Sequence, residues 1–178
     1  MQKKFITNLG FLLVLNFLIK PFYILGIDAE IINRVGAETY GVYFTLFNFS
    51  FLFNIVLDLG INNYSTTTLA KSEHLLPKFF SRLLSLKVLL LGVYVLFTLL
   101  MGLVWGYSNY EIKLLLLLVL NQGIVALIMY LRSNLSGIQL FFKDSIVSVL
   151  DRFLMIFICS VLLWGGFTNK PFEIEWFI

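Results

Sequence analysis

The chain has 178 residues, of which 60% are hydrophobic and 13% are charged, and its formal net charge is +3. A soluble domain is about 45–50% apolar and about 25% charged, so this composition excludes an ordinary soluble fold. The mean hydropathy of +0.93 and the long apolar blocks indicate a polytopic membrane protein instead. One cysteine, Cys159, excludes an internal disulfide, and one histidine, His74, argues against a histidine metal site.

The first apolar block, residues 9–27, follows Lys3 and Lys4, an order also found in signal peptides. This block is too long for a signal peptide, contains Lys20 and Pro21, and is not followed by a small-residue cleavage site. We therefore predict a first transmembrane helix with a kink at Pro21, which cannot donate a backbone hydrogen bond.

A second crossing is predicted for residues 40–60, with no charged side chain between Tyr40 and Leu57. Residues 40–57 span roughly 27 Å as a helix, close to the hydrocarbon thickness of a bilayer. Three more crossings are predicted at residues 83–104, 112–131 and 145–164, with a basic loop before the third and another loop at 132–144.

The last apolar residues, from about 174, would begin a sixth crossing without completing it. We therefore expect residues 1–178 to form a single all-α transmembrane bundle of five complete helices plus the start of a sixth. On this interpretation the sequence is the N-terminal part of a longer protein.

Topology follows from the distribution of cations between the two sides of the predicted bundle. The side opposite the N-terminus holds Arg34, Lys113 and Lys170, together with most of the acidic residues. The positive-inside rule therefore predicts a cytoplasmic N-terminus in the cytoplasmic membrane. The cations on the N-terminal side are Lys3, Lys4, Lys71, Lys78, Arg82, Lys87, Arg132, Lys143 and Arg152.

Ionisable residues inside membrane helices are costly, so each is a functional candidate. Asn16, Lys20 and Tyr23 share one face of the first helix, and Asn48 falls at about the same depth in the second. Lys20 either faces a hydrated cavity that receives an anionic head group, or snorkels and bonds to neighbouring helices.

Asp58 falls near the cytoplasmic end of the second crossing, level with Lys87 and Arg82 of the third. A structural ion pair with Lys87 is the favoured role for Asp58, and a cation-coupling site is the alternative. Asn121 and Gln122 in the fourth helix are expected to form hydrogen bonds across the bundle.

Two short motifs mark the second crossing. Arg34, Gly36, Tyr40-Gly41 and Tyr43 form R-x-G-x-x-x-Y-G-x-Y, and Asp58-Leu59-Gly60 forms D-L-G. This stretch resembles the second transmembrane helix of bacterial polysaccharide exporters of the multidrug/oligosaccharidyl-lipid/polysaccharide exporter superfamily. The resemblance implies a two-lobed helical transporter that flips lipid-linked oligosaccharides, of which this chain would be most of the first lobe.

The resemblance implies a flippase that moves the repeat unit of a polysaccharide such as O-antigen by alternating access. Lys20, Asn16, Asn48 and Arg34 would contact the substrate, and Asp58 and Lys87 would supply a structural or coupling charge. The expected partners are the lipid-linked oligosaccharide, the bilayer, and a C-terminal lobe or other polysaccharide-assembly proteins, with no nucleic acid, cofactor or metal.

Two alternatives remain open: a cation-coupled exporter of small molecules, and a membrane scaffold or assembly subunit that transports nothing. An enzyme is not expected, because the sequence contains no phosphate-binding glycine loop, paired-histidine motif or nucleophile elbow.

Overall fold

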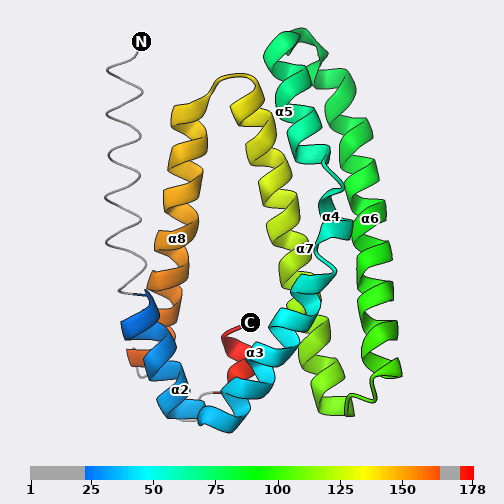
Figure 1. Cartoon of the computed structure of the whole chain (residues 1–178). Helices are drawn as coiled ribbons and strands as arrows, with labels where there is room; N and C mark the ends of the chain where they lie inside the picture. Colours follow the sequence, from blue (N-terminus) through cyan, green and yellow to red (C-terminus); the bar gives the residue numbers. More distant parts are fainter. Residues whose placement is uncertain (1–22, 165–172) are drawn as a thin grey trace. The chain divides into compact units, whose positions relative to one another are not determined.

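The computed structural model describes residues 23–164 and 173–178, and every regular element among them is helical (Figure 1). The all-α prediction is confirmed for these residues. The predicted first crossing lies almost wholly outside them, as do Asn16, Lys20 and the expected kink at Pro21. In chain order the elements are η1 (Tyr23–Asp28), α2 (Ala29–Val35), α3 (Ala37–Leu52), α4 (Ile55–Asp58), α5 (Ile61–Lys71), η2 (Glu73–Leu75), α6 (Leu76–Val104), α7 (Asn109–Gly137), α8 (Phe141–Trp164) and η3 (Ile174–Trp176).

Three of the described helices, α6, α7 and α8, are long and apolar enough to cross a membrane. A fourth span results if α3 and the helical segment Ile55–Lys71, which are bent by 44° relative to each other, count as one broken crossing. These spans correspond to the predicted second to fifth crossings, and their character fits a membrane protein.

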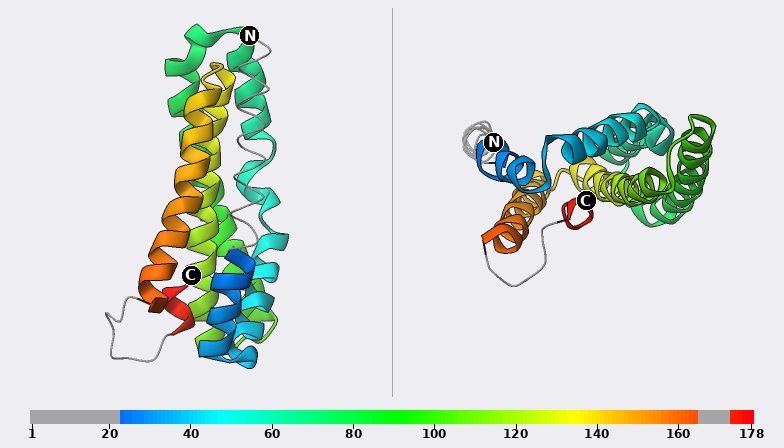
Figure 2. Two further views of the ribbon diagram at one scale, coloured as in Figure 1. Left: turned by 90° about the vertical axis from the view of Figure 1, so that its left-hand side faces the viewer. Right: turned by 90° about the horizontal axis from the view of Figure 1, so that it is seen from below.

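Contacts between residues divide the chain into two compact units. One unit contains η1, α2 and α8, and the other is built from residues Gly41–Leu140. Within the second unit, α4 packs on α6, α5 packs on α7, and α6 packs on α7. The views in Figures 1 and 2 agree that α5, α6 and α7 run side by side.

The core of the second unit consists of apolar residues contributed by different helices. Leu57, Tyr94, Leu115 and Val119 form one buried cluster, with Phe49 packed against it. A second cluster joins α5, α6 and α7 through Ile61, Leu90 and Tyr130. Phe49 also meets the rings of Phe53 and Tyr107 edge to face, each with a centroid separation of 5.3 Å.

Two predicted loops are largely helical in the structure. Residues 61–71 form α5, whose polar side chains Ser65 and Thr66 contact α7. The helix α7 continues through Gly137, and α8 begins at Phe141, so the predicted loop at 132–144 shrinks to a short connection. Tertiary hydrogen bonds therefore hold polar sequence in helices where composition alone predicted loops.

Helix starts are set locally where the sequence carries a cap. Ser108 begins α7 with a capping box: its hydroxyl accepts a hydrogen bond from the Glu111 backbone N–H at 3.3 Å, and its own N–H donates to Glu111 Oε2 at 2.8 Å. Pro77 lies in the first turn of α6, where its missing donor costs little.

Candidate functional site

The candidate site is a break in the second apolar segment, at the D-L-G motif. Leu59 has φ 42° and Gly60 has φ 81°, so two successive residues are left-handed. An α-helix of L-residues cannot continue through such a pair, and α4 ends where α5 must begin anew. A further interruption follows α3, where the backbone N–H of Phe53 donates to Ser50 O at 3.3 Å, one residue short of the α-helical partner.

Interrupting a helix leaves backbone carbonyls without their usual donors, and α6 supplies replacements. Lys87 Nζ donates to the carbonyl of Leu57 at 2.9 Å, and the Tyr94 hydroxyl donates to the carbonyl of Ser50 at 2.9 Å. Lys87 and Tyr94 are seven residues apart on α6 and therefore share a face. Both breaks in the crossing are thus stabilised by the same neighbouring helix.

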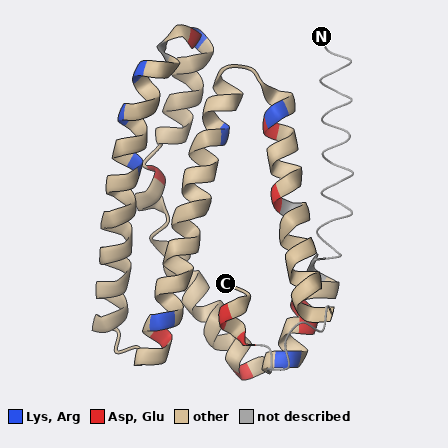
Figure 3. Cartoon of the chain, turned by 180° about the vertical axis from the view of Figure 1, so that it is seen from behind, with Lys and Arg blue, Asp and Glu red and all other residues tan. Residues whose placement is uncertain are grey.

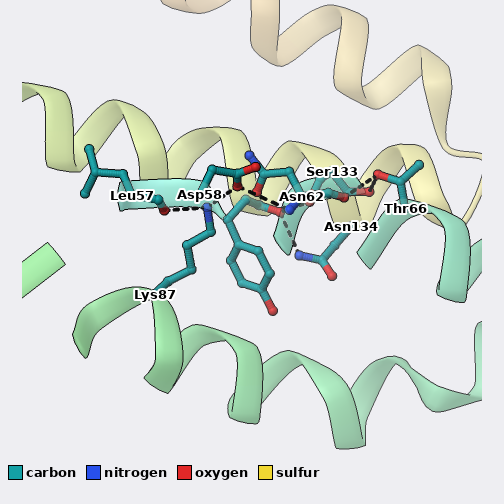
Figure 4. A network of polar contacts seen from close by, with 8 residues as sticks. Leu57, Asp58, Asn62, Thr66, Lys87, Ser133 and Asn134 are labelled. Atoms are coloured by element: carbon teal, nitrogen blue, oxygen red, sulfur yellow. Dashed lines mark hydrogen bonds and ion pairs between the residues drawn. The ribbon is translucent and has the colours of Figure 1, made fainter. Parts of the chain in front are cut away.

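Asp58 joins the two helical pieces electrostatically. Its Oδ1 accepts a hydrogen bond from Lys87 Nζ at 2.5 Å and another from the Asn62 backbone N–H at 3.2 Å (Figure 4). The carboxylate therefore faces the positive end of α5, while the Lys87 ammonium contacts the last turn of α4. The Lys87 side chain is 1% exposed, whereas that of Asp58 is 38% exposed.

Hydrogen bonds continue from the break along the contact between α5 and α7. The Thr66 hydroxyl lies 2.9 Å from the Asn62 carbonyl and 3.1 Å from the Ser133 carbonyl. Ser65 donates to Asn134 Oδ1 at 2.8 Å, in a position that is buried on both sides. Polar side chains therefore connect α5 to α7 through the interior of the unit. Figure 4 shows the contact of Thr66 with Ser133.

A second amide contact lies at the start of α4. Asn54 Nδ2 donates to Gln122 Oε1 at 3.2 Å, so Gln122 forms the predicted hydrogen bond across the bundle. Two buried oxygens in the described residues, Asn62 Oδ1 and Thr98 Oγ1, have no hydrogen-bond partner.

The structure brings together two of the predicted site residues, Asp58 and Lys87. Arg34 instead pairs with Glu30 of its own helix, α2, at 2.8 Å. Asn48 is exposed on α3, and its Nδ2 donates to the Phe44 carbonyl at 2.7 Å. Lys20 and Asn16 lie outside the described residues.

The inward face of α5 was not predicted from the sequence. Ile61, Ser65 and Leu69 are all buried and recur every four residues, which is a helical period with a small polar residue at its centre. This spacing is visible in the amino-acid sequence alone. The role of the Leu57 and Ser50 carbonyls is not visible there, because it depends on a break in the backbone.

The arrangement can hold two opposite charges at a helix break and present one of them, the carboxylate, on a partly exposed surface. Within the described part of the chain, no three His, Cys, Asp or Glu side chains gather in a way that could hold a metal ion. Comparisons of this chain with protein-family models, curated proteins and solved structures found no match.

Proposed function

We propose that the chain is part of a flippase that moves a lipid-linked oligosaccharide across the cytoplasmic membrane by alternating access. The motifs that flank the second crossing support this function through their resemblance to polysaccharide exporters. In this proposal the chain supplies one helical lobe, and the polar groups of the broken crossing face the path of the sugar.

The observation that carries the proposal is the broken crossing with a charge pair at the break. Non-helical backbone at membrane depth is tolerated only where protein buries it or where it lines a water-filled cavity. Transporters use such discontinuous helices at substrate and ion sites. Asp58 lies at such a helix break, because it ends α4, and 38% of its side chain is exposed.

Exposed polar side chains on the same crossing support a hydrated surface. Asn48 on α3 and Asn63 and Thr67 on α5 are all exposed, and the carboxylate of Asp58 is partly exposed. Lipid is a poor environment for amide and carboxylate groups, whereas water and sugar hydroxyls can hydrogen-bond to them.

The direct test is transport of a polyprenyl-diphosphate-linked oligosaccharide by the protein in proteoliposomes, measured as sugar that becomes accessible to an external lectin. We expect Lys20→Ala to reduce transport at least tenfold while the membrane level of the protein is unchanged, because Lys20 would attract the diphosphate. The exposed Lys71→Ala is the matched control and should transport normally.

The possible outcomes distinguish the role of Lys20 from the flippase proposal itself. Normal transport by a normally expressed Lys20→Ala protein contradicts the role of Lys20 alone. Absence of transport by the wild-type protein, purified at its full native length from its own membrane, contradicts the flippase proposal. The intact mass of the protein from its native membrane completes the test, since a mass well above 20.5 kDa means that the native chain is longer than these residues, as the one-lobe proposal requires.

A cation-coupled exporter of small molecules is the second candidate, and the exposed part of the Asp58 carboxylate favours it. This function requires Asp58 to bind an ion or a proton during transport. Efflux driven by an imposed pH or sodium gradient, and lost in Asp58→Asn, would support the exporter over the flippase.

A further inference from the structure

The outward face of α6 begins with a basic, hydroxyl-bearing segment. Lys78, Ser81, Arg82 and Ser85 are all exposed, and their spacings of three and four residues place them on one side of the helix. Neither Lys78 nor Arg82 forms an ion pair with another residue in the described part of the chain. Lysine and arginine gather at this end of the unit, where α5 turns into α6 (Figure 3).

The same face of α6 continues into an apolar groove of about 650 Å³. Its lining includes Val88, Leu91, Gly92, Val95 and Leu99 of α6 and Leu120 of α7. Along α6 the lining runs from Val88 to Leu103, roughly 22 Å by helical rise. One leaflet of hydrocarbon is roughly 15 Å deep, so the groove is long enough for one acyl chain.

Gly92 keeps the groove open. A Cβ atom added at Gly92 would have no neighbour within 4 Å, so the space above this glycine is not filled by protein. Placed across a bilayer, an exposed groove of this kind is filled by lipid.

We propose that this face of α6 binds an anionic phospholipid, with its phosphate between Lys78 and Arg82 and one acyl chain in the groove. Charge complementarity identifies the occupant. Two cations one helical turn apart can hold one phosphate, and the arginine fork matches phosphate oxygens in particular. Arg82 and Val88 are separated by roughly 9 Å of helix, which leaves room for the glycerol beside Ser85.

A zwitterionic lipid fits this face less well, because its own cationic group would meet Lys78 and Arg82. Basic residues near the membrane surface attract anionic lipids by about 1 kcal/mol each, so two of them correspond to a preference of roughly 30-fold. The proposal does not depend on what the protein transports.

Native mass spectrometry of the purified chain can test the head-group contacts. The probes are phosphatidylglycerol and phosphatidylcholine with identical acyl chains, and glycerol 3-phosphate, which has the phosphate without the chains. We expect wild-type protein to prefer phosphatidylglycerol roughly 30-fold, and Lys78→Gln/Arg82→Gln to lose that preference. Lys71→Gln/Lys143→Gln removes the same charge at exposed residues off this face and should keep it.

The groove is tested separately. Gly92→Leu places a side chain in the open space, so we expect weaker binding of both phospholipids at an unchanged melting temperature. Gly41→Leu, at another exposed helical glycine with open space, is the control and should bind as wild type.

Equal binding of the two phospholipids by wild type would overturn the proposal, as would a preference that survives Lys78→Gln/Arg82→Gln. Competition by glycerol 3-phosphate as effective as that by the lipid would also overturn it, since the site would then recognise phosphate alone. Unaltered lipid binding by Gly92→Leu would exclude the groove as the place of the acyl chain.

Discussion

Lys87 lies among packed helices with 2% of its surface exposed, and its ammonium group has two acceptors, the Asp58 carboxylate and the Leu57 carbonyl. Removing one partner of a buried ion pair costs more than the pair itself contributes, because the remaining charge is left uncompensated. The two partners are not equivalent here. The Asp58 side chain is 38% exposed, whereas that of Lys87 is 1% exposed.

This asymmetry predicts different costs for removing the two partners. Asp58→Ala should lower the free energy of unfolding by about 3–5 kcal/mol, since it leaves Lys87 buried with a single carbonyl acceptor. Lys87→Met should cost about 1–3 kcal/mol, since it keeps the packing volume and leaves a carboxylate that can be hydrated. Unfolding in mixed micelles, followed by circular dichroism, measures both.

The double variant Asp58→Ala/Lys87→Met supplies the control for this comparison. It removes both charges at once, so its cost should be smaller than the sum of the two single losses. A larger cost for Lys87→Met than for Asp58→Ala would contradict the assigned burial of the pair.

Gly137 lies at a close contact between α7 and α5. An added Cβ would lie 2.9 Å from Leu69 Cβ and 3.3 Å from the Thr66 backbone. Gly137→Ala should therefore push the helices apart and destabilise the unit by about 1–3 kcal/mol. Gly92→Ala adds the same methyl group in open space and should be neutral or slightly stabilising; equal melting temperatures of the two variants would argue against this close packing.

At the scale of the element, the broken crossing is defined by backbone conformation more than by side-chain packing. Gly60 has φ 81°, and a Cβ there would meet nothing within 4 Å, so any penalty for alanine comes from the backbone alone. The α4–α5 junction then places Asp58 where it accepts from the Asn62 N–H and from Lys87.

Gly60→Ala should accordingly lower stability by about 1 kcal/mol, the cost of a left-handed L-residue. The control is Gly41→Ala, a helical glycine with equally open surroundings, which should gain up to about 1 kcal/mol. Thermal unfolding of the two proteins in the same detergent compares them. A stabilised Gly60→Ala protein would mean that the crossing is continuous at this residue.

The extents of α5 and α7 illustrate what sequence could predict for single elements. The apolar centres of α6, α7 and α8 were found, because uninterrupted hydrophobic runs at membrane length have few other structures available. The polar helix α5 and the polar C-terminal part of α7 were predicted as loops instead. Ser65 and Asn134 look like loop residues in sequence, and they are helical because they hydrogen-bond to each other across two helices.

At the scale of the molecule, the turns at the two ends of α6 should lie on opposite sides of the membrane. The test is to replace Cys159 with serine, introduce a single cysteine at His74 or at Ser108, and label the protein with a membrane-impermeant maleimide. The positive-inside rule predicts that Ser108→Cys is labelled from outside in intact cells, and His74→Cys only after permeabilisation. Labelling of both from outside would contradict a spanning α6.

The sequence by itself determined the class of this protein, because long runs without charged residues are typical of membrane-spanning helices. The distribution of lysine and arginine also predicts the orientation of these helices. The sequence also paired Asp58 with Lys87, since both were expected at the same depth. Only the tertiary structure decided how that pair works. The left-handed conformation at Leu59 and Gly60 frees the Leu57 carbonyl and ends α4 at Asp58, and the packing of α6 on α4 buries Lys87 against both. Such contacts depend on where two helices meet, which no pattern within one of them specifies.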